Sequence, residues 1–545
     1  MVGCIMEWQL TSESDFMNRH WWLIVLLFGV FVCGQTAVPL FAAEGDPIVT
    51  TRQGKLRGKR VSPGVLRFAG IPYAQPPLGE LRFKPPLPAQ PWDGIRDARD
   101  FGPVGIQIYD NFTGDYFMNQ SEDCLSANVW TPGIDNKRRP VIVFLHGGGF
   151  LLGGANHPTM HGTQFAQRGD VVFVSVQYRL SVLGWLDLEG LGGPEYKHSK
   201  NAGLLDQLLA LRWVQQNIAA FGGDPGNVTL MGESAGSISA TSMMLMPEAR
   251  KLFHKVIAES AIFAVNRTPA RATKVTQEFL DETGAKNLND LLALNTDEIR
   301  EAIVRLILRL NLKEQVFFEP VLDGDLLPKD PWKYVAQGHT KGIKLLTGTN
   351  QFETQFWLLY HRKQMRLRSR RILGGLLVDG LEVKPVDVAR MFGTVQEAYP
   401  NRTKSDIYMD MLTFELFRYP HIAFSEIHGT HTDTWMYMFA WKPPRLHGIG
   451  AFHALELPFV FNNLGGWERI LGDNPPRHLA HDMQDAWIAF ARNGDPNHRG
   501  MSNWPRYRKE DRHTMIFADR SQLASDPEKN LRIPWQQLWR SRSER

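Results

Sequence analysis

Cysteine is scarce in this chain, and its distribution excludes a fold that is held together by disulfide bonds. Only three cysteines occur among the 545 residues, and two of them lie within the first 33 residues. The rest of the chain keeps Cys124 alone, so no intramolecular disulfide can form there. A chain of this length can depend on a large buried core instead of covalent cross-links.

Neither sign of charge dominates the sequence. Lysine and arginine number 61 and aspartate and glutamate 57, which leaves a net charge of +4. An imbalance this small gives no electrostatic reason to expect nucleic acid as a partner. The sequence also has no repeat of fixed period, no low-complexity tract and no linker that would separate independent halves. With 43% apolar and 22% charged residues, we expect a globular protein.

The apolar run near the N-terminus falls short of a comfortable membrane span. It covers residues 21–33, follows a basic pair and leads to the small residues Ala42 and Ala43. A membrane-spanning helix needs about 20 apolar residues, whereas this layout is typical of a secretory signal peptide. We therefore expect residues 1–43 to be a signal peptide, with Met17 as an alternative start, and the protein to be periplasmic or extracellular. An uncleaved signal anchor is the alternative interpretation.

Apolar segments alternate along the chain with segments of helical periodicity. The segments predicted to be strands are the short ones within 48–70 and the buried ones at 140–150, 170–180, 228–233, 342–350 and 433–441. The segments predicted to be helices are 203–223, a stretch that begins at Ser234, and 483–494. This order predicts an α/β fold with a mostly parallel sheet covered on both faces. We expect residues 44–545 to form one such domain, with helical excursions at about 250–430.

Ser234 lies between two glycines at the point where a buried strand gives way to a helix. Residues 232–236 read Gly-Glu-Ser-Ala-Gly. Small residues could serve a tight turn and nothing more. The same pattern, however, is that of a nucleophile elbow, in which a strained backbone exposes the serine and a helix N-terminus faces the substrate.

A serine nucleophile needs a base, and the base needs an acid that orients it. In the fold class that carries this elbow, the acid and then the histidine follow the serine along the chain. The chain has 17 histidines, so composition alone does not select the base.

Motifs along nearly the whole chain resemble those of the type-B carboxylesterase family. The segment AAFGGDPGNVTLMGESAG, residues 219–236, is similar to the active-site signature of that family. Other motifs follow the family's order: GIPYAQPPLGELRFKPP (70–86), SEDCLSANVWTP (121–132), FLHGGGF (144–150), QYRLSVLGWL (177–186), GTNQFE (348–353), GAFHALELPFVF (450–461) and WIAFARNGDPN (487–497). The resemblance implies an α/β-hydrolase fold whose helical excursions cover an active-site gorge.

The resemblance also implies a serine carboxylesterase that hydrolyses carboxylic esters through an acyl-enzyme. Ser234 would be the nucleophile, Glu353 the triad acid and His453 the base. His447 is a rival base, but it lacks the surroundings that the family pattern requires. Glu353 follows a predicted strand, where loops build sites in α/β sheets.

The glycine-rich segment HGGGF can supply backbone N–H groups to a negatively charged intermediate. By the same resemblance, the oxyanion hole would consist of Gly148, Gly149 and Ala235. A plain glycine-rich turn is the alternative, although consecutive glycines are costly in chain entropy. We expect no cofactor and no metal, and a small-molecule ester as the partner.

Other family features concern structure instead of chemistry. The resemblance implies two structural ion pairs, Arg82 with Glu122 and Arg179 with Asp206. It also implies a disulfide partner for Cys124 upstream, where this chain has Gly105, so we expect a free and buried thiol. Residues 104–123 contain no tryptophan. Because a quaternary ammonium substrate needs an aromatic cage, we do not expect a cholinesterase.

Two clusters of titratable residues admit more than one interpretation. Six lysines and arginines lie within residues 361–371, either on a solvated helix face or on a basic rim that favours anionic esters. The sequence HLAHD at 478–482 has histidines at helical spacing, which we expect on a surface helix and not at a metal site.

Two other functions use the same features. An amidase, carbamate hydrolase or lactonase could carry the same triad, because the shape of the pocket selects the leaving group. A non-catalytic adhesion protein could keep the fold, but such relatives lose triad residues that this chain retains.

Overall fold

The structure is a computed structural model that describes residues 45–108, 119–261, 263, 267–310, 318–356, 377, 383–446 and 448–543. The expected signal peptide at 1–43, the basic segment 361–371 and the rival base His447 lie outside the described residues. These three predictions stay predictions.

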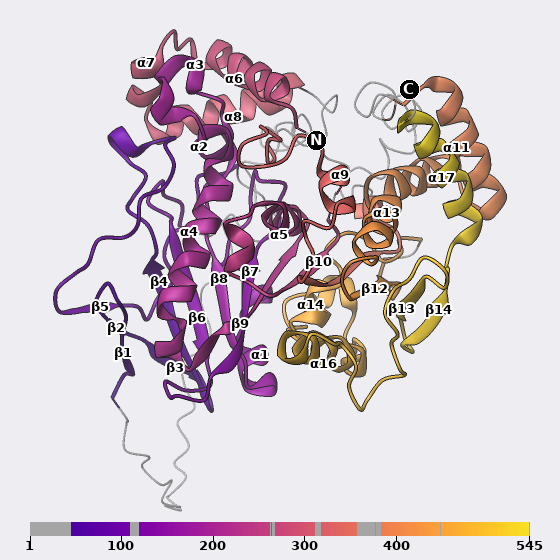
Figure 1. The fold of residues 1–545 in the computed structure, drawn as a ribbon, viewed down its shortest axis with the longest axis horizontal. Coiled ribbons are helices and arrows are strands. Elements are labelled where there is room, and N and C mark those ends of the chain that lie inside the picture. The colour runs from indigo at the N-terminus through magenta and orange to yellow at the C-terminus, as the bar shows by residue number, and fades with distance from the viewer. Residues whose placement is uncertain are drawn as a thin grey trace, which may run out of the picture.

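A mixed sheet of 11 strands forms the centre of the molecule (Figure 1). Its strands, in spatial order, are β14 (Gln522–Ser525), β13 (His513–Phe517), β12 (Thr434–Phe439), β11 (Lys344–Asn350), β10 (Lys255–Glu259), β9 (Gly223–Glu233), β7 (Arg139–Leu145), β8 (Val172–Val176), β6 (Ser126–Thr131), β4 (Val65–Pro72) and β3 (Lys59–Ser62). Neighbouring strands are parallel from β13 to β8 and antiparallel at both ends. The expected mostly parallel sheet is therefore present.

A second, smaller sheet is formed by strands near the start of the described chain. It contains β1 (Ile48–Thr50), β2 (Lys55–Arg57) and β5 (Ile95–Asp97). The short strands expected within 48–70 thus divide between the two sheets.

Strand β7 shows why the central strands are apolar at every position. Val141, Val143 and Leu145 belong to one hydrophobic cluster, and the residues between them, Ile142 and Phe144, belong to another. Because alternate side chains point to opposite faces, both faces of the sheet are buried. Continuous apolar runs are what such strands require.

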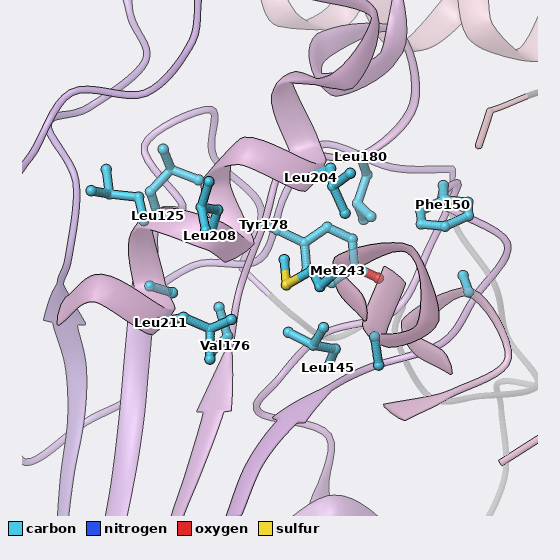
Figure 2. Packing of buried hydrophobic residues seen from close by; sticks show 14 of the residues in the cluster. Leu125, Leu145, Phe150, Val176, Tyr178, Leu180, Leu204, Leu208, Leu211 and Met243 are labelled. Carbon is cyan, nitrogen blue, oxygen red and sulfur yellow. The ribbon is translucent and has the colours of Figure 1, made fainter. Parts of the chain in front are cut away.

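Helices cover each of these faces. The first cluster includes residues of α4 (Ala202–Asn217) and α5 (Ala235–Leu245), and the second includes residues of α1 (Thr163–Gly169), α14 (Leu457–Val460) and α16 (Arg477–Asn493). Figure 2 shows the first cluster at Tyr178, which is surrounded by leucines of α4 and by Met243 of α5.

The helical excursions lie between β10 and β12. They comprise α6 (Pro269–Thr283), α7 (Leu288–Ala293), α8 (Thr296–Leu310) and α9 (Pro331–Ala336), then α11 (Pro385–Ala398), α12 (Lys404–Thr413) and α13 (Tyr419–His428). Figure 1 shows α6, α7 and α8 together at one end of the molecule, and α11, α13 and the C-terminal α17 (Lys529–Ser543) at the other. The remaining short helices are α2 (Ser181–Trp185), α3 (Glu189–Gly192) and α15 (Glu468–Leu471). No helix among the described residues is long and apolar enough to cross a membrane.

The carboxyl ends of the central strands bring distant chain segments to one edge of the sheet. Strands β7, β9, β10 and β11 end at 145, 233, 259 and 350 and continue directly into HGGGF, Ser234, Ser260 and the Glu353 loop. Ligand sites of open α/β sheets form at such an edge. The fold thus places the predicted nucleophile, acid and glycine loop together.

Candidate active site

Ser234 occupies a sharp turn between β9 and α5. Its φ of 53° and ψ of −121° are outside the regions that side-chain-bearing residues favour. A Cβ on Gly232 would lie 2.3 Å from the backbone of Gly236, and a Cβ on Gly236 would lie 1.9 Å from the Leu145 carbonyl oxygen. Both glycines are therefore needed for strand and helix to approach this closely, and the turn has the geometry of a nucleophile elbow.

Glu353 and His453 form a direct pair at the same edge of the sheet. His453 Nδ1 lies 2.8 Å from Glu353 Oε2, and the Glu353 side chain is fully buried. The other carboxylate oxygen, Oε1, accepts hydrogen bonds of 2.7 Å from Ser260 Oγ and from the Asn350 backbone N–H. These bonds orient the carboxylate, so that the histidine carries its proton on Nδ1 and directs Nε2 away from Glu353.

Backbone hydrogen bonds attach the histidine loop to the acid loop. Phe352 N–H donates to Ala451 O at 2.8 Å, and His453 N–H donates to the Glu353 carbonyl at 3.1 Å. Gly450 N–H donates to the Gln355 side-chain oxygen at 2.7 Å. The acid and the base are thus fixed together by main-chain contacts as well as by their side chains.

His453 Nε2 faces the residue that precedes the nucleophile. It lies 3.3 Å from Glu233 Oε1, while Ser234 Oγ makes no hydrogen bond to any residue in the described part of the chain. Burial lowers the pKa of His453, but the charges of Glu233 and Glu353 more than offset this and raise it to about 9. The structure therefore shows His453 between two carboxylates, one of which belongs to the residue that precedes Ser234.

Two further buried glutamates lie near this histidine. Burial and the charges of Glu233 and Glu353 raise the pKa of Glu456 to about 8, and burial raises the pKa of Glu233 to about 7. Glu456 accepts hydrogen bonds from Asn350 Nδ2 and, at 3.4 Å, from Ser260 Oγ. Glu259 accepts a hydrogen bond from the Trp487 indole, and its pKa is also raised by burial.

The glycine loop after β7 lies directly against the elbow. A Cβ on Gly147 would lie 3.1 Å from Ser234 Cβ. Gly148 and Gly149 have φ values of 110° and 63°, and no atom lies within 4 Å of the position that a Gly149 Cβ would occupy. Ala235 is the first residue of α5, where backbone N–H groups lack helical partners. The structure thus places the start of the glycine loop and the first residue of α5 next to Ser234.

A five-residue π-helix, Phe414–Arg418, supports the histidine from the other side. The ring of Phe417 lies 5.3 Å from the His453 ring, and Arg418 Nη2 donates to the Asn350 carbonyl at 3.1 Å. Phe356 also approaches the histidine, with ring centroids 6.3 Å apart. Such π-helical turns often occur at functional sites.

The structural features expected beside the site are present. Arg82 meets Glu122 at 2.7 Å, and Arg179 meets Asp206 at 2.6 Å in a fully buried pair. Cys124 is a free, buried thiol whose pKa is raised by burial, and it lines the same small cavity as Gly105. The expectation of an unpaired cysteine is confirmed.

Four further residues of the site have no motif that marks them as functional in the sequence: Glu233, Ser260, Asn350 and Glu456. Glu233 is the variable position of the Gly-x-Ser-x-Gly pattern, and Glu456 lies three residues after His453. Ser260 directly follows a buried strand, as Ser234 does. A search for polar residues at the carboxyl ends of apolar strands could have found Ser260 and Asn350.

Comparison with known proteins identifies the family of this chain. The model of the carboxylesterase family matches residues 45–533. The para-nitrobenzyl esterase of Bacillus subtilis is 38% identical over 507 residues, which cover 91% of this chain and 99% of that protein. The liver carboxylesterase of Sus scrofa is 32% identical, with 89% and 90% covered. The crystal structure of the Geobacillus stearothermophilus carboxylesterase EST55 at pH 6.2 has a TM-score of 0.81 at 36% identity, with 90% of this chain and all of that chain covered.

These matches extend over most of the chain, and the likeness to the solved structures agrees with the mostly parallel sheet flanked by helices. The chain belongs to the carboxylesterase family and is a carboxylic ester hydrolase with the α/β-hydrolase fold.

Proposed function

We propose that the protein is a serine esterase that works through an acyl-enzyme. Ser234 Oγ attacks the ester carbonyl carbon while His453 Nε2 accepts the hydroxyl proton. The tetrahedral intermediate collapses, the bond to the alkoxy group breaks, and His453 returns the proton to the leaving alcohol. Water, deprotonated by His453, then attacks the acyl-enzyme and releases the acid and free Ser234.

Glu353 and the glycine loop have supporting roles in this proposal. Glu353 accepts the Nδ1 hydrogen bond and stabilises the imidazolium that forms in each half-reaction. Backbone N–H groups of Gly148, Gly149 and Ala235 donate to the oxyanion. Preorganised donors of this kind typically contribute the largest single share of transition-state stabilisation.

One observation carries the proposal: Glu353 orients His453, whose other nitrogen contacts Glu233, the residue that directly precedes the strained Ser234. The 2.8 Å contact of Nδ1 with Glu353 orients the ring, and Nε2 lies 3.3 Å from Glu233, the residue that adjoins Ser234. The histidine must exchange Glu233 for the Ser234 hydroxyl before it can act as the base.

The test is hydrolysis of p-nitrophenyl esters from acetate to decanoate by the full-length protein. We expect Ser234→Ala to lower kcat by at least about 10⁴-fold, because the nucleophile is lost. Ser237→Ala is the matched control: this serine lies one turn further along, in α5, is fully buried, and its hydroxyl makes no hydrogen bond in the described part of the chain. It should keep kcat within about two-fold.

Stopped-flow kinetics can test the acyl-enzyme separately. A burst of p-nitrophenol that matches the enzyme concentration would show that acylation precedes a slower deacylation. Turnover that survives in folded Ser234→Ala would contradict the proposal. Hydrolysis of amides, carbamates or lactones in preference to every ester would favour the alternative substrates for the same triad.

A further inference from the structure

The loop after β7 carries an unusual concentration of strained backbone. Gly148, Gly149, Phe150 and Gly153 have φ values of 110°, 63°, 58° and 104°. Phe150 has a side chain and still adopts this left-handed conformation, which costs energy for any residue other than glycine. A loop of this kind keeps its shape only when contacts from the surrounding structure hold it.

The Gln107 side chain supplies such a contact at the far end of the loop. Its Nε2 donates to the Gly153 carbonyl at 3.0 Å, and its Oε1 accepts from the Gly153 N–H at 2.8 Å. The second Nε2 hydrogen donates to the Gly105 carbonyl at 3.1 Å. The side chain is fully buried, so water does not compete for these bonds.

No other side chain in the described part of the chain hydrogen-bonds to residues 148–153. Within the loop, the N–H groups of Leu151 and Leu152 donate to the Gly148 carbonyl, and the Ser181 backbone N–H donates to the Phe150 carbonyl. Figure 2 shows Phe150 at the border of the packed cluster that contains Tyr178. The amide of Gln107 is thus the side-chain anchor of this loop.

Leu152 connects Gly153 to the candidate oxyanion hole, because it is bonded to Gly153 and packs closely against Gly148. Leu152, the neighbour of Gly153, has its carbonyl oxygen only 2.0 Å from where a Gly148 Cβ would lie. Its N–H also bonds to the Gly148 carbonyl at 3.1 Å. A shift of Gly153 would therefore move Leu152 against Gly148.

Gln107 is itself fixed without a disulfide. Its backbone N–H donates to the Gln120 side-chain oxygen at 3.1 Å. Val104 forms an isolated bridge with Gln120, with hydrogen bonds of 2.8 and 2.9 Å to Asn119 and Ser121. Hydrogen bonds close the base of this segment, and Cys124 stays free.

We propose that Gln107 is a positioning residue, whose amide holds the loop 148–153 in the conformation that directs the Gly148 and Gly149 N–H groups at the oxyanion. This inference rests on the proposed function, because it needs the oxyanion hole to lie at those glycines. Gln107 touches neither substrate nor reacting atoms. It acts through Gly153 and Leu152.

The test replaces the amide by an apolar side chain of similar length, Gln107→Met. We expect kcat for p-nitrophenyl butyrate to fall about 10- to 100-fold, since loss of a whole oxyanion donor costs 10²- to 10³-fold. KM should stay within about two-fold. The inhibition constant of a trifluoromethyl ketone, whose hemiketal carries an oxyanion, should rise by the same factor as kcat falls.

Asn201 offers a matched control within the same chain. It is fully buried, and its amide also pairs with both backbone groups of one residue, Val321, at 3.1 and 2.8 Å. Asn201→Leu should lower the unfolding midpoint as Gln107→Met does, but leave kcat and ketone inhibition within about two-fold. Gln107→Asn keeps an amide that is too short for both Gly153 atoms. If Gln107→Met does not fold, the same measurements of kcat and ketone inhibition are made on Gln107→Asn.

Ser234→Ala, measured in parallel, separates the two hypotheses. If Ser234→Ala retains turnover, the proposed function is wrong. The positioning role is wrong if Ser234→Ala is inactive while Gln107→Met keeps its kcat and its ketone affinity. It is also wrong if kcat and ketone affinity fall no further in Gln107→Met than in Asn201→Leu.

Discussion

At the scale of single residues, the state of His453 depends on two carboxylates at opposite sides of its ring. Glu353 lies 2.8 Å from Nδ1, and Glu233 lies 3.3 Å from Nε2. The first contact is needed throughout the proposed reaction, whereas the second competes with Ser234 for the catalytic nitrogen. A protonated His453 cannot act as a base, so the raised pKa of about 9 limits activity at low pH.

Glu233→Gln should lower the pH at which protonation of His453 begins to limit activity. Glu233 has a pKa of about 7 and is therefore charged where His453 titrates, near pH 9. Removing the negative charge lowers the pKa of His453, so the rising limb of kcat/KM against pH should shift towards acid by about one unit. The profile is measured with a p-nitrophenyl ester between pH 6 and 10.

Glu248→Gln is the control for this prediction, because Glu248 is exposed and pairs only with Arg212 among the described residues. Its profile should match that of the unchanged protein. An unshifted limb in Glu233→Gln would show that Glu233 does not set the pKa of the base.

The residues of the site differ in how far sequence could predict them. Ser234 has a local signal, two flanking glycines after an apolar strand. Glu353 and His453 are predicted by their order along the chain and by family resemblance, and the structure brings them together. Ser260 and Glu456 carry no local signal of their own, because their importance arises from hydrogen bonds to segments about 100 to 200 residues away.

At the scale of secondary structure elements, the packing of α5 on β7 and β9 decides whether the elbow can form. The contact is backbone against backbone at Gly232 and Gly236, with Leu145 of β7 as the nearest neighbour. No side-chain rearrangement can relieve a clash there.

Gly236→Ala should therefore disrupt the elbow. The new methyl would lie 1.9 Å from the Leu145 oxygen, so α5 would have to move away from the sheet. We expect a loss of roughly 3 kcal/mol in the free energy of unfolding, together with a loss of ester hydrolysis. Urea unfolding and kcat measure the two effects.

Gly190→Ala provides the comparison, since nothing lies within 4 Å of its Cβ position. It should change stability by no more than about 0.5 kcal/mol. Equal effects of the two substitutions would mean that the close approach at Gly236 does not constrain the fold.

Sequence predicts the strands best where both faces of the sheet are covered by helices. Strands β7, β8, β9, β11 and β12 match expected segments because continuous apolar runs of this length are distinctive. Helix α16 begins at Arg477, directly after Pro476, whereas the expected helix begins at 483; its first turn already buries Leu479 and Ala480. Strand β10 has five residues within the interval expected to be helical, and only its pairing with β9 and β11 distinguishes it.

At the scale of the whole molecule, folding buries several carboxylic acids at one edge of the central sheet. Glu233, Glu259, Glu353 and Glu456 are all almost inaccessible to solvent. A carboxyl group whose pKa is higher in the folded state than in the unfolded state binds more protons when folded. The stability of the protein then falls as pH rises between those two values.

Glu456→Gln should reveal this dependence. The pKa of Glu456 rises from an ordinary 4.5 to about 8 in the folded protein, so its charge opposes folding increasingly from pH 5 to pH 8. The variant carries no such charge. The free energy of unfolding of the variant, minus that of the unchanged protein, should therefore be about 2–4 kcal/mol larger at pH 9 than at pH 5.

Urea unfolding of both proteins at the two pH values measures this gain. Glu195→Gln, at an exposed position whose folded pKa is lowered by Lys84, should not show it. A Glu456→Gln variant that follows the unchanged protein at both pH values would contradict the prediction.

The contacts that build the site also determine when it can appear during synthesis and refolding. The pairs Glu353–His453, Ser260–Glu456 and Glu259–Trp487 join residues that are 100, 196 and 228 positions apart. Contacts of such long range form late, after the loops between them have closed. A nascent chain that ends before α16 lacks Trp487, the hydrogen-bond partner of Glu259 at this edge of the sheet. Recovery of hydrolysis after dilution from denaturant should therefore lag behind the recovery of helix content, and mark the completion of folding.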